Sequence, residues 1–334
     1  IDSPPKGRNS SPTTCAPRFT TIHPHCRLCS TTDTSWWQWM LMATSRLYLP
    51  SPMKSVLLTL ALCLCPLLTL RSQTATPEDS VAAPRISWRG LSHDATRTTL
   101  FVGMGRNLLY DSYLSPLDYS GQTLGIGSLS ERQKRWAKGS ITSFFRWNLN
   151  GTRAKKATGE GLLWDAEGEL TYGVHYNRLP APGLRVGVGG ALGLHVGGTY
   201  STRNGNNPAQ GRAALEGAIT GVADYHFRAL KQRWQWRTQV DVPVAGLMFS
   251  PQYGQSYYEI FGLGHYDHNL RLAHPFNAPS VRIFSTLSLP FAHRRFAIGL
   301  DANIRQSHIN GLKRHAWNTM LVISYTRTLK FLDR

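Results

Sequence analysis

Cysteine is confined to the beginning of the chain. The 334 residues contain five cysteines, and all of them precede Gln73: Cys15, Cys26, Cys29, Cys63 and Cys65. Residues 73–334 therefore form no disulfide and need another source of stability. His23, His25 and the pair Cys26-x-x-Cys29 contain metal-ligand types, but one CxxC without a second pair is a weak signal. We predict no metal and no other cofactor.

Long apolar runs are also missing from most of the chain. No stretch after Gln73 has eighteen consecutive apolar residues, which argues against a membrane-spanning helix. The apolar run from Val56 to Leu70 follows Met53-Lys54, is interrupted by Pro66 and ends in a polar segment. This is the layout of a secretory signal peptide. We expect Met53 to be the start, residues 53–72 a cleaved signal peptide, and residues 1–52 a disordered extension upstream of the protein proper.

Acidic residues are scarce compared with basic ones. Residues 73–334 contain 30 Lys and Arg against 17 Asp and Glu, a net charge of +13. A basic chain favours anionic partners, which include nucleic acid, membrane surfaces and the phosphates of lipopolysaccharide. Because export separates the chain from nucleic acid, we expect lipid and lipopolysaccharide as partners and no nucleic acid.

What the chain does contain is long alternation of apolar and polar residues. In the stretch from Gly183 to Tyr200, "GLRVGVGGALGLHVGGTY", alternate positions from Leu184 to Val196 are aliphatic except for Gly190, and the other positions are small or polar. This is the period of a β-strand. The same alternation occurs in 141–149, 162–176, 213–227, 236–244, 281–289 and 296–304.

The length of these strands favours a membrane barrel over a soluble sandwich. Strands in soluble sheets have about 5 to 6 residues, whereas membrane barrel strands need about 10 tilted residues, with aromatic residues near both ends. We predict strands near 97–106, 119–129, 136–149, 161–176, 183–199, 212–227, 233–246, 279–290, 296–308 and 315–329. The fold predicted is an all-β, antiparallel, up-and-down transmembrane β-barrel.

Connection lengths orient this barrel, because such proteins have short periplasmic turns and long extracellular loops. Short connections are expected at 130–135, 177–182, 228–232 and 291–295, and long ones at 107–118, 150–160, 200–211 and 247–278. Their alternation favours ten strands with both chain ends in the periplasm. Twelve strands remain open if residues 247–278 contain another hairpin. The lumen-facing Gly187, Gly189, Gly193 and Gly197 would let a narrow barrel curve, or make room for neighbouring inward side chains.

Charged residues of both signs occupy positions expected to face the lumen. The predicted lumen charge network consists of Arg146, Asp165, Glu167, Glu169, Arg185, Glu216, Asp224, Arg237, Asp241, Arg282, Asp301 and Arg305. Side chains fill much of a barrel of this size. We therefore interpret the network as paired charges that close the lumen, and keep a narrow channel for small solutes as an alternative.

The segment 247–278 is rich in tyrosine, histidine and acidic residues. A candidate outer-loop surface comprises Tyr253, Tyr257, Tyr258, Glu259, His265, Asp267 and His268. His265, Asp267 and His268 match no defined metal geometry. A lipid-modifying barrel enzyme would need a serine, a histidine and an acidic side chain at the rim, and Ser256, His265 and Glu259 offer those types without a supporting spacing. We assign no catalytic, cofactor-binding or metal residue, and we keep a lipid-modifying barrel enzyme as an alternative to a barrel without enzymatic activity.

Two stretches, "YLSPLDYSG" from Tyr113 to Gly121 and "FSPQYGQSYYEIF" from Phe249 to Phe261, carry a resemblance to a known family. Over residues 95–330 the chain resembles uncharacterised outer-membrane proteins of Bacteroidetes grouped as domain of unknown function 3316. The resemblance implies an outer-membrane location and a barrel, and it supplies no activity or site residues.

The resulting hypothesis is a monomeric outer-membrane β-barrel of a Gram-negative bacterium. Residues 73–95 are expected to form a periplasmic N-terminal segment and residues 96–334 the barrel, inserted by the barrel-assembly machinery. Basic clusters at 132–138, 228–233 and 293–295 are expected at periplasmic turns, and Asn150-Gly151 is interpreted as a turn. The lumen would be closed by charges, and the outer loops would form a binding or structural surface.

Overall fold

A computed structural model of the chain describes residues 95–134, 140–157, 159, 161–205, 207–290 and 295–330. The chain divides into two units, Ile1–Ala83 and Pro84–Arg334, and all described residues belong to the second. The predictions for residues 1–52, for the signal peptide and for nearly all of the N-terminal segment lie outside the described residues. Among the described residues, no helix has the length and apolar character needed to cross a membrane.

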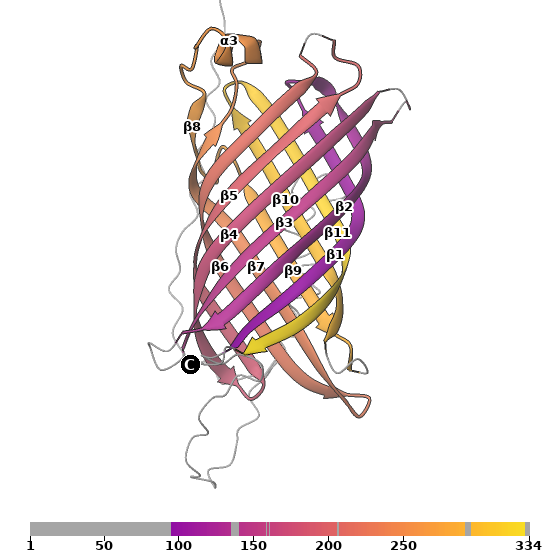
Figure 1. The fold of residues 1–334 in the computed structure, drawn as a ribbon, viewed down its shortest axis with the longest axis vertical. Coiled ribbons are helices and arrows are strands. Elements are labelled where there is room, and N and C mark those ends of the chain that lie inside the picture. Colours follow the sequence, from indigo (N-terminus) through magenta and orange to yellow (C-terminus); the bar gives the residue numbers. More distant parts are fainter. Residues whose placement is uncertain are drawn as a thin grey trace, which may run out of the picture. The chain divides into compact units, whose positions relative to one another are not determined.

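The second unit is a closed antiparallel β-barrel (Figure 1). Its strands are β1 (Ala95–Asp111), β2 (Ser115–Gln133), β3 (Ile141–Lys156), β4 (Leu162–Ala181), β5 (Leu184–Ser201), β6 (Ala209–Ala229), β7 (Gln232–Phe249), β8 (Leu270–Ala273), β9 (Ser280–Ser288), β10 (Phe296–Ile309) and β11 (Leu312–Lys330). Each long strand pairs with its sequence neighbours, and β1 pairs with β11 to close the ring. Without the short β8, this is the predicted ten-stranded up-and-down barrel.

The strands run further than the apolar alternation indicated. The predicted loops 107–118, 150–160 and 200–211 shrink to connections at 112–114, 157–161 and 202–208. Asn150-Gly151 is no turn: both residues lie inside β3, paired with β4. Polar and turn-type residues at these ends do not stop the strands, because the neighbouring strand continues to supply backbone hydrogen-bond partners on both sides. Of the four predicted long connections, only 247–278 remains long in the described structure, as the segment between β7 and β9.

The long segment contains a short helix and a broken strand in place of a further hairpin. Ser256 caps helix α3 (Tyr257–Phe261) in a capping box with Glu259. Strand β8 pairs with the end of β7, from Gly246 to Phe249, whereas β9 pairs with β7 only up to Asp241. β8 and β9 are thus two pieces of one wall strand, separated by residues 274–279, which include two prolines. Twelve strands are therefore ruled out for this part of the chain.

The two ends of the barrel differ in their connections. At one end, called the α3 end, lie α3 and the turns 112–114, 157–161, 202–208 and 310–311. At the other, called the far end, lie the connections 134–140, 182–183, 230–231 and 289–295. β1 begins and β11 ends at the far end, since Ala95 is paired with Lys330. The two ends of the barrel sheet therefore share one side, as the parity of the strands predicted.

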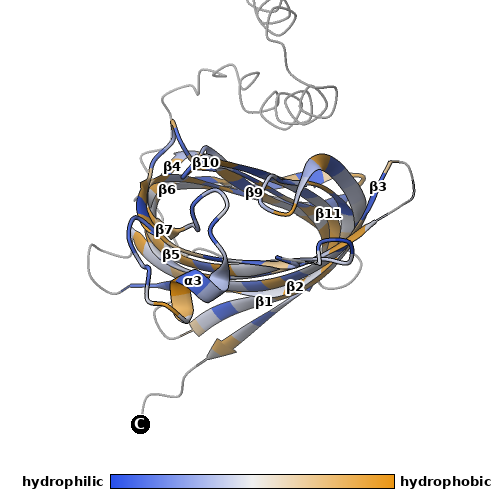
Figure 2. Cartoon of the chain, turned by 90° about the horizontal axis from the view of Figure 1, so that it is seen from above, coloured by the Kyte–Doolittle hydropathy of each residue, from blue (hydrophilic) through white to orange (hydrophobic). Residues whose placement is uncertain are grey.

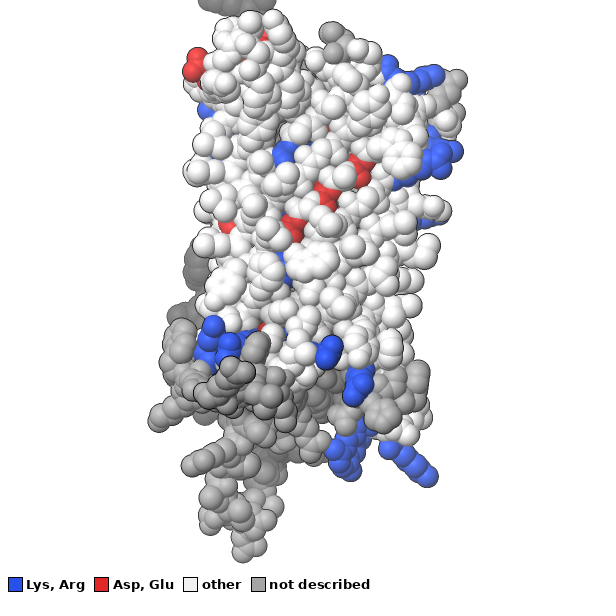
Figure 3. Space-filling model, viewed as in Figure 1, with Lys and Arg blue, Asp and Glu red and all other residues white. Residues whose placement is uncertain are grey.

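Apolar side chains face outward and polar side chains face inward. Leu192 on β5, Leu321 on β11 and Met104 on β1 are 66%, 73% and 64% exposed on the outer face. Seen along its axis, the barrel is a closed ring of strands (Figure 2). The visible face is largely free of Lys and Arg between its two ends (Figure 3). Exposed apolar surface of this extent marks contact with lipid or protein.

A layer of apolar side chains crosses the lumen. It consists of Phe101, Leu129, Phe144, Ala191, Phe284, Met320 and Val322, all buried. The ring centroids of Phe101 and Phe284 are 4.9 Å apart, and Phe144 stacks on His175 at 4.7 Å. Phe101 and Phe284 come from β1 and β9, which β10 and β11 separate in the wall, whereas Phe144 and His175 come from the neighbouring strands β3 and β4. The interior is therefore packed like a small protein core at this level.

Glycines of β5 allow this packing in two ways. A Cβ at Gly187 would lie 2.6 Å from Oδ1 of Asn177, so this glycine makes room for an inward side chain, as predicted. At Gly189 a Cβ would overlap the carbonyl oxygen of Val174 on the neighbouring strand, so close backbone approach is the constraint there. At Gly193 the nearest atom would be 3.8 Å away, and the position has space.

This contrast gives a matched pair of substitutions. We expect Gly189→Ala to lower the free energy of unfolding by about 1 to 3 kcal/mol, because the methyl group must push two strands apart. Gly193→Ala is expected to be neutral or to stabilise by about 0.4 to 1 kcal/mol through a less flexible unfolded chain. Urea unfolding of the folded chain in detergent micelles measures both. Equal effects at the two positions would contradict the packing described.

Candidate functional site

Buried charges fill the lumen in three clusters along the barrel axis. The far-end cluster comprises Arg97, Glu131, Arg185, Asp224 and Arg237; the middle cluster Arg146, Glu169, Glu216, Asp241, Arg282, Asp301 and Arg305; and the α3-end cluster Asp111, Asp165, Glu167, Arg212 and Arg314. Each guanidinium group in these clusters has at least one carboxylate partner, which offsets the large cost of burying a charge.

In the far-end cluster, three guanidinium groups share two carboxylates. Glu131 accepts from Arg97 at 2.5 Å and lies 2.9 Å from Arg237. Asp224 accepts from Arg185 and lies 3.5 Å from Arg237. Arg237 therefore stands between both acids. Its Nε makes no hydrogen bond with any described residue, although the side chain is almost completely buried.

The middle cluster links opposite walls of the barrel. Arg146 on β3 donates to Asp241 on β7 at 2.5 Å and to Glu169 on β4 at 2.9 Å. Arg282 on β9 donates to the same Glu169 at 2.7 Å and holds Asp301 through two of its nitrogens. Arg305 on β10 donates to Glu216 on β6. Here four carboxylates meet three guanidinium groups.

The α3-end cluster is also richer in acids. Arg314 on β11 donates to Glu167 on β4 at 2.6 Å, and Arg212 on β6 donates to Asp165 at the same distance. Asp111 lies 3.9 Å from Arg212. Three carboxylates thus meet two guanidinium groups.

These contacts cross the lumen, so the side chains obstruct it. The pairs β3–β7, β4–β11 and β6–β10 are not neighbours in the wall, and an arginine spans the interior in each case. Together with the apolar layer, the clusters leave no room for a wide aqueous pore. The cavity within the middle cluster has a volume of about 30 Å³, roughly that of one water molecule.

All twelve residues of the predicted lumen charge network face inward and belong to these clusters. Sequence reasoning missed Arg97, Glu131, Arg212, Arg314 and Asp111. Glu131 had been placed in a short turn, and Arg314 and Asp111 beyond the predicted strand ends. Arg97 and Arg212 already stood on the polar face of predicted strands, so the alternation could have identified them.

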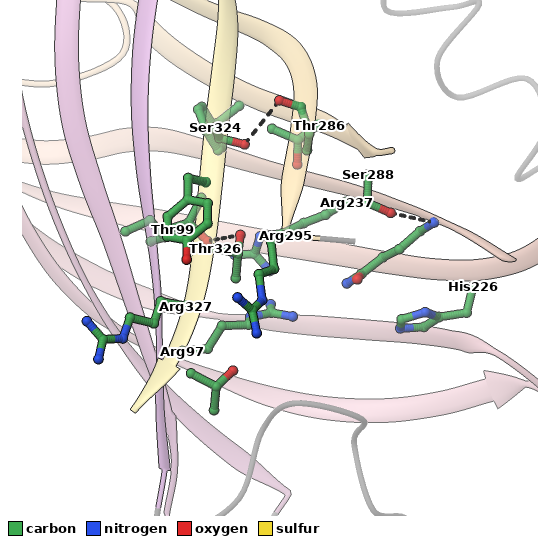
Figure 4. A pocket seen from close by; sticks show the side chains of 16 residues that line it. Arg97, Thr99, His226, Arg237, Thr286, Ser288, Arg295, Ser324, Thr326 and Arg327 are labelled. Carbon is green, nitrogen blue, oxygen red and sulfur yellow. Dashed lines mark hydrogen bonds between the residues drawn. The ribbon is translucent and has the colours of Figure 1, made fainter. Parts of the chain in front are cut away.

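A cavity of about 750 Å³ opens below the far-end cluster, and we call it the vestibule (Figure 4). Phe284 and Leu129 from the apolar layer form part of its lining. The arginines in its lining are Arg97, Arg237 and Arg295, and the inward hydroxyl groups are those of Thr99, Thr286, Ser288, Ser324, Thr326 and Thr328. Tyr325 and Arg327 border the cavity from outward positions of β11. None of the 16 described residues that line it is acidic.

The segment 250–279 is fastened to the α3 end of the barrel. The hydroxyl of Tyr257 accepts from the backbone N–H of Gly211 at 2.6 Å and donates to its carbonyl at 3.0 Å. Tyr113 donates to the carbonyl of Gln255 at 2.9 Å. Asn310 donates to the carbonyls of Ser250 and His268, each at 2.9 Å. The loop therefore bridges three separate turns and strands of the rim.

Of the predicted outer-loop surface, five residues are exposed: Tyr253, Tyr258, His265, Asp267 and His268. Tyr257 is a half-buried anchor and Glu259 completes the helix cap, so these two serve the loop's own structure. The hydroxyl of Ser256 accepts from the N–H of Glu259, and no hydrogen bond between Ser256 and His265 is present. No group of metal-ligating side chains forms among the described residues. The loop thus contains no assembled catalytic or metal centre in its described part.

Comparison with known proteins gives one family and several barrels. A family profile described as "Protein of unknown function (DUF3316)" matches residues 60–334. No curated protein matches the chain. The outer membrane protease OmpT from Escherichia coli has a TM-score of 0.39 and 10% identity, covering 71% of this chain and 98% of that one. The transport unit of the autotransporter AIDA-I from Escherichia coli has a TM-score of 0.37 and 8% identity, covering 81% and 96%. The attachment invasion locus protein Ail of Yersinia pestis has a TM-score of 0.28 and 9% identity, covering 69% and 98%. These similarities concern the fold alone.

Removing one arginine from the middle cluster tests the pairing. We expect Arg146→Met to lower the free energy of unfolding by about 3 to 5 kcal/mol, because Asp241 loses its guanidinium partner while it stays buried. Arg178→Met is the control, since Arg178 is exposed on the outer face above the ring of Tyr176 and should cost at most about 1 kcal/mol. Unfolding in urea compares the two variants. An equal loss in both would contradict a network that stabilises the barrel.

The loop anchor gives a second prediction. Burial and the neighbouring Tyr257 and Asp111 raise the pKa of Tyr113 to about 12. The difference in ultraviolet absorbance between the native chain and Tyr113→Phe should show phenolate formation near pH 12, and near pH 10 once both are denatured. Because the folded pKa is higher, this part of the stability is present below pH 10 and is lost as the pH rises toward 12. A folded-state midpoint near pH 10 would contradict the anchored geometry.

Proposed function

We propose that the chain, which belongs to the family described as protein of unknown function (DUF3316), is a closed β-barrel of a bacterial outer membrane. In this proposal the lumen does not conduct solutes, and the α3-end loop forms a binding or structural surface outside the cell. The observation that carries the proposal is the inverted distribution of side chains, with exposed apolar residues outside and buried, paired charges inside.

The outer face supports a location in lipid. Its apolar side chains alternate with inward polar ones along strands that are long enough to cross a hydrocarbon layer. Aromatic residues lie near both ends of this face: Trp164 and Tyr200 toward the α3 end, and Tyr176 and Phe296 toward the far end, each between 44% and 50% exposed. Aromatic girdles of this kind sit at the two membrane–water interfaces. Closure of the sheet also satisfies the backbone groups that lipid cannot.

The connections support an orientation. Extracellular loops of such barrels are longer than periplasmic turns, and the segment 250–279 lies at the α3 end. The α3 end is then extracellular, and the far end, with the start of β1 and the end of β11, faces the periplasm. The same proposal includes four further points: cleavage of a signal peptide at 53–72, contact with lipopolysaccharide, insertion by the barrel-assembly machinery and a monomeric state.

The alternatives have less support in the geometry. A conducting pathway would have to pass the cross-lumen arginines and the Phe101–Phe284 contact. A lipid-modifying enzyme would need a nucleophile and a base in contact, and Ser256 is engaged in its helix cap. We therefore favour the closed barrel.

Single-channel recording in planar bilayers tests closure. We expect the refolded chain, residues 73–334, to give no stable conductance. Arg185→Ala combined with Arg237→Ala should leak, because two of the three guanidinium groups of the far-end cluster disappear and the two carboxylates repel. The matched control is Arg153→Ala combined with Arg178→Ala, which removes two exposed outward arginines.

The recording has clear contrary outcomes. Stable conductance of the native chain would favour the channel and overturn the closed barrel. Leakage of the control double variant would show that the assay responds to charge loss in general. Fractionation of a Gram-negative host tests the location separately, and recovery of the folded chain outside the outer-membrane fraction would contradict it.

A further inference from the structure

The vestibule combines an excess of positive charge with a wall of hydroxyl groups. We propose that it is a binding site for a small phosphate-bearing ligand that enters from the far end of the barrel. The site is defined by the barrel's own residues and does not depend on which membrane holds it.

The charge balance of the lumen is uneven along its axis, and the vestibule lies at its positive end. The middle and α3-end clusters each have one carboxylate more than guanidinium groups, whereas the far-end cluster has one guanidinium group more. Arg295 adds a further positive charge at the vestibule wall. An anion is the ligand that this imbalance attracts.

Arg237 connects the network to the cavity. It lines the vestibule, its side chain is 8% exposed, and it contacts both carboxylates of the far-end cluster. Guanidinium groups bind phosphate oxygens through paired, charge-assisted hydrogen bonds.

The remaining lining suits the same chemistry. Thr286, Ser288 and Thr326 lie on inward positions of β9 and β11, and hydroxyl groups donate to the oxygens of a phosphate or to the hydroxyls of a sugar attached to it. The volume of about 750 Å³ is within the range of small-molecule sites. Figure 4 shows Arg295, Arg237 and the labelled hydroxyl residues around this space, whereas Arg327 points away from it. A metal cation would find no carboxylate among the 16 lining residues.

Calorimetric titration with inorganic pyrophosphate tests the proposal, using the folded chain in an uncharged detergent at low ionic strength. We expect saturable binding at one site per chain. Arg295→Gln should weaken it about tenfold, since a charge-assisted contact contributes that order of affinity. Arg295 is exposed and lies outside the buried network, so the variant should fold.

The matched control is Arg178→Gln, which removes the same charge from the outer face. Unchanged affinity in this control supports a defined site. An equal loss in both variants would mean general electrostatic attraction and would overturn the proposal. The native chain is first shown to be folded by its resistance to unfolding in cold detergent. Absence of saturable binding by this folded chain would also overturn the proposal.

Phosphorus analysis of the purified native chain distinguishes two sources of the same chemistry. About one phospholipid phosphorus per chain, lost in Arg295→Gln but kept in the control, would identify a lipid headgroup as the ligand. Pyrophosphate binding by a chain that retains no lipid phosphorus would identify a soluble phosphate compound. Both results support the site, and neither depends on conductance.

Discussion

Ion pairs between arginines and carboxylates of opposite walls organise the interior of this barrel. An isolated buried charge is strongly unfavourable, and its cost is offset only where a partner of opposite sign lies within hydrogen-bond distance. Arg146 is 2% exposed and reaches Asp241 and Glu169 on two other strands. Such reach requires a narrow barrel. The contacts that stabilise the buried charges are therefore the same contacts that cross the lumen.

Pairing also explains why the interior can be polar without being wet. Between the far-end and middle clusters, Phe101, Phe144 and Phe284 occupy the space that water would otherwise fill. Low local polarity strengthens the neighbouring ion pairs, because screening by solvent is reduced. The far-end cluster is the exception, since it borders a cavity and has more guanidinium groups than carboxylates. Its excess charge faces the vestibule.

Much of this architecture follows from the alternation in the sequence, and the errors have physical causes. Alternation with a period of two predicted ten strands and placed twelve charged residues inside the barrel. The pattern is informative because a shift of one residue would move every side chain to the opposite face of the sheet. The strand ends were not predicted correctly. Asn150-Gly151 and the charged residues near the strand ends are typical of turns, but pairing with the neighbouring strands keeps these residues extended. Helix α3 was missed because five residues with a capping box are too short for a periodic signal. Residues of β1, β2, β6, β7, β9, β10 and β11 line the vestibule, a juxtaposition that requires the closed sheet.

The interruption between β8 and β9 leaves a gap in the backbone hydrogen-bond ladder of the barrel wall. Along β7, the ladder to this side stops at Asp241 and resumes at Gly246, and Pro243 within the gap has no N–H to donate. Elsewhere in the described wall, cross-strand bonds continue past each local irregularity. Thermal fluctuations open a sheet where its bonds are fewest. The barrel wall should therefore open most often beside Pro243. Amide hydrogen exchange should be fastest there, and unfolding should begin there.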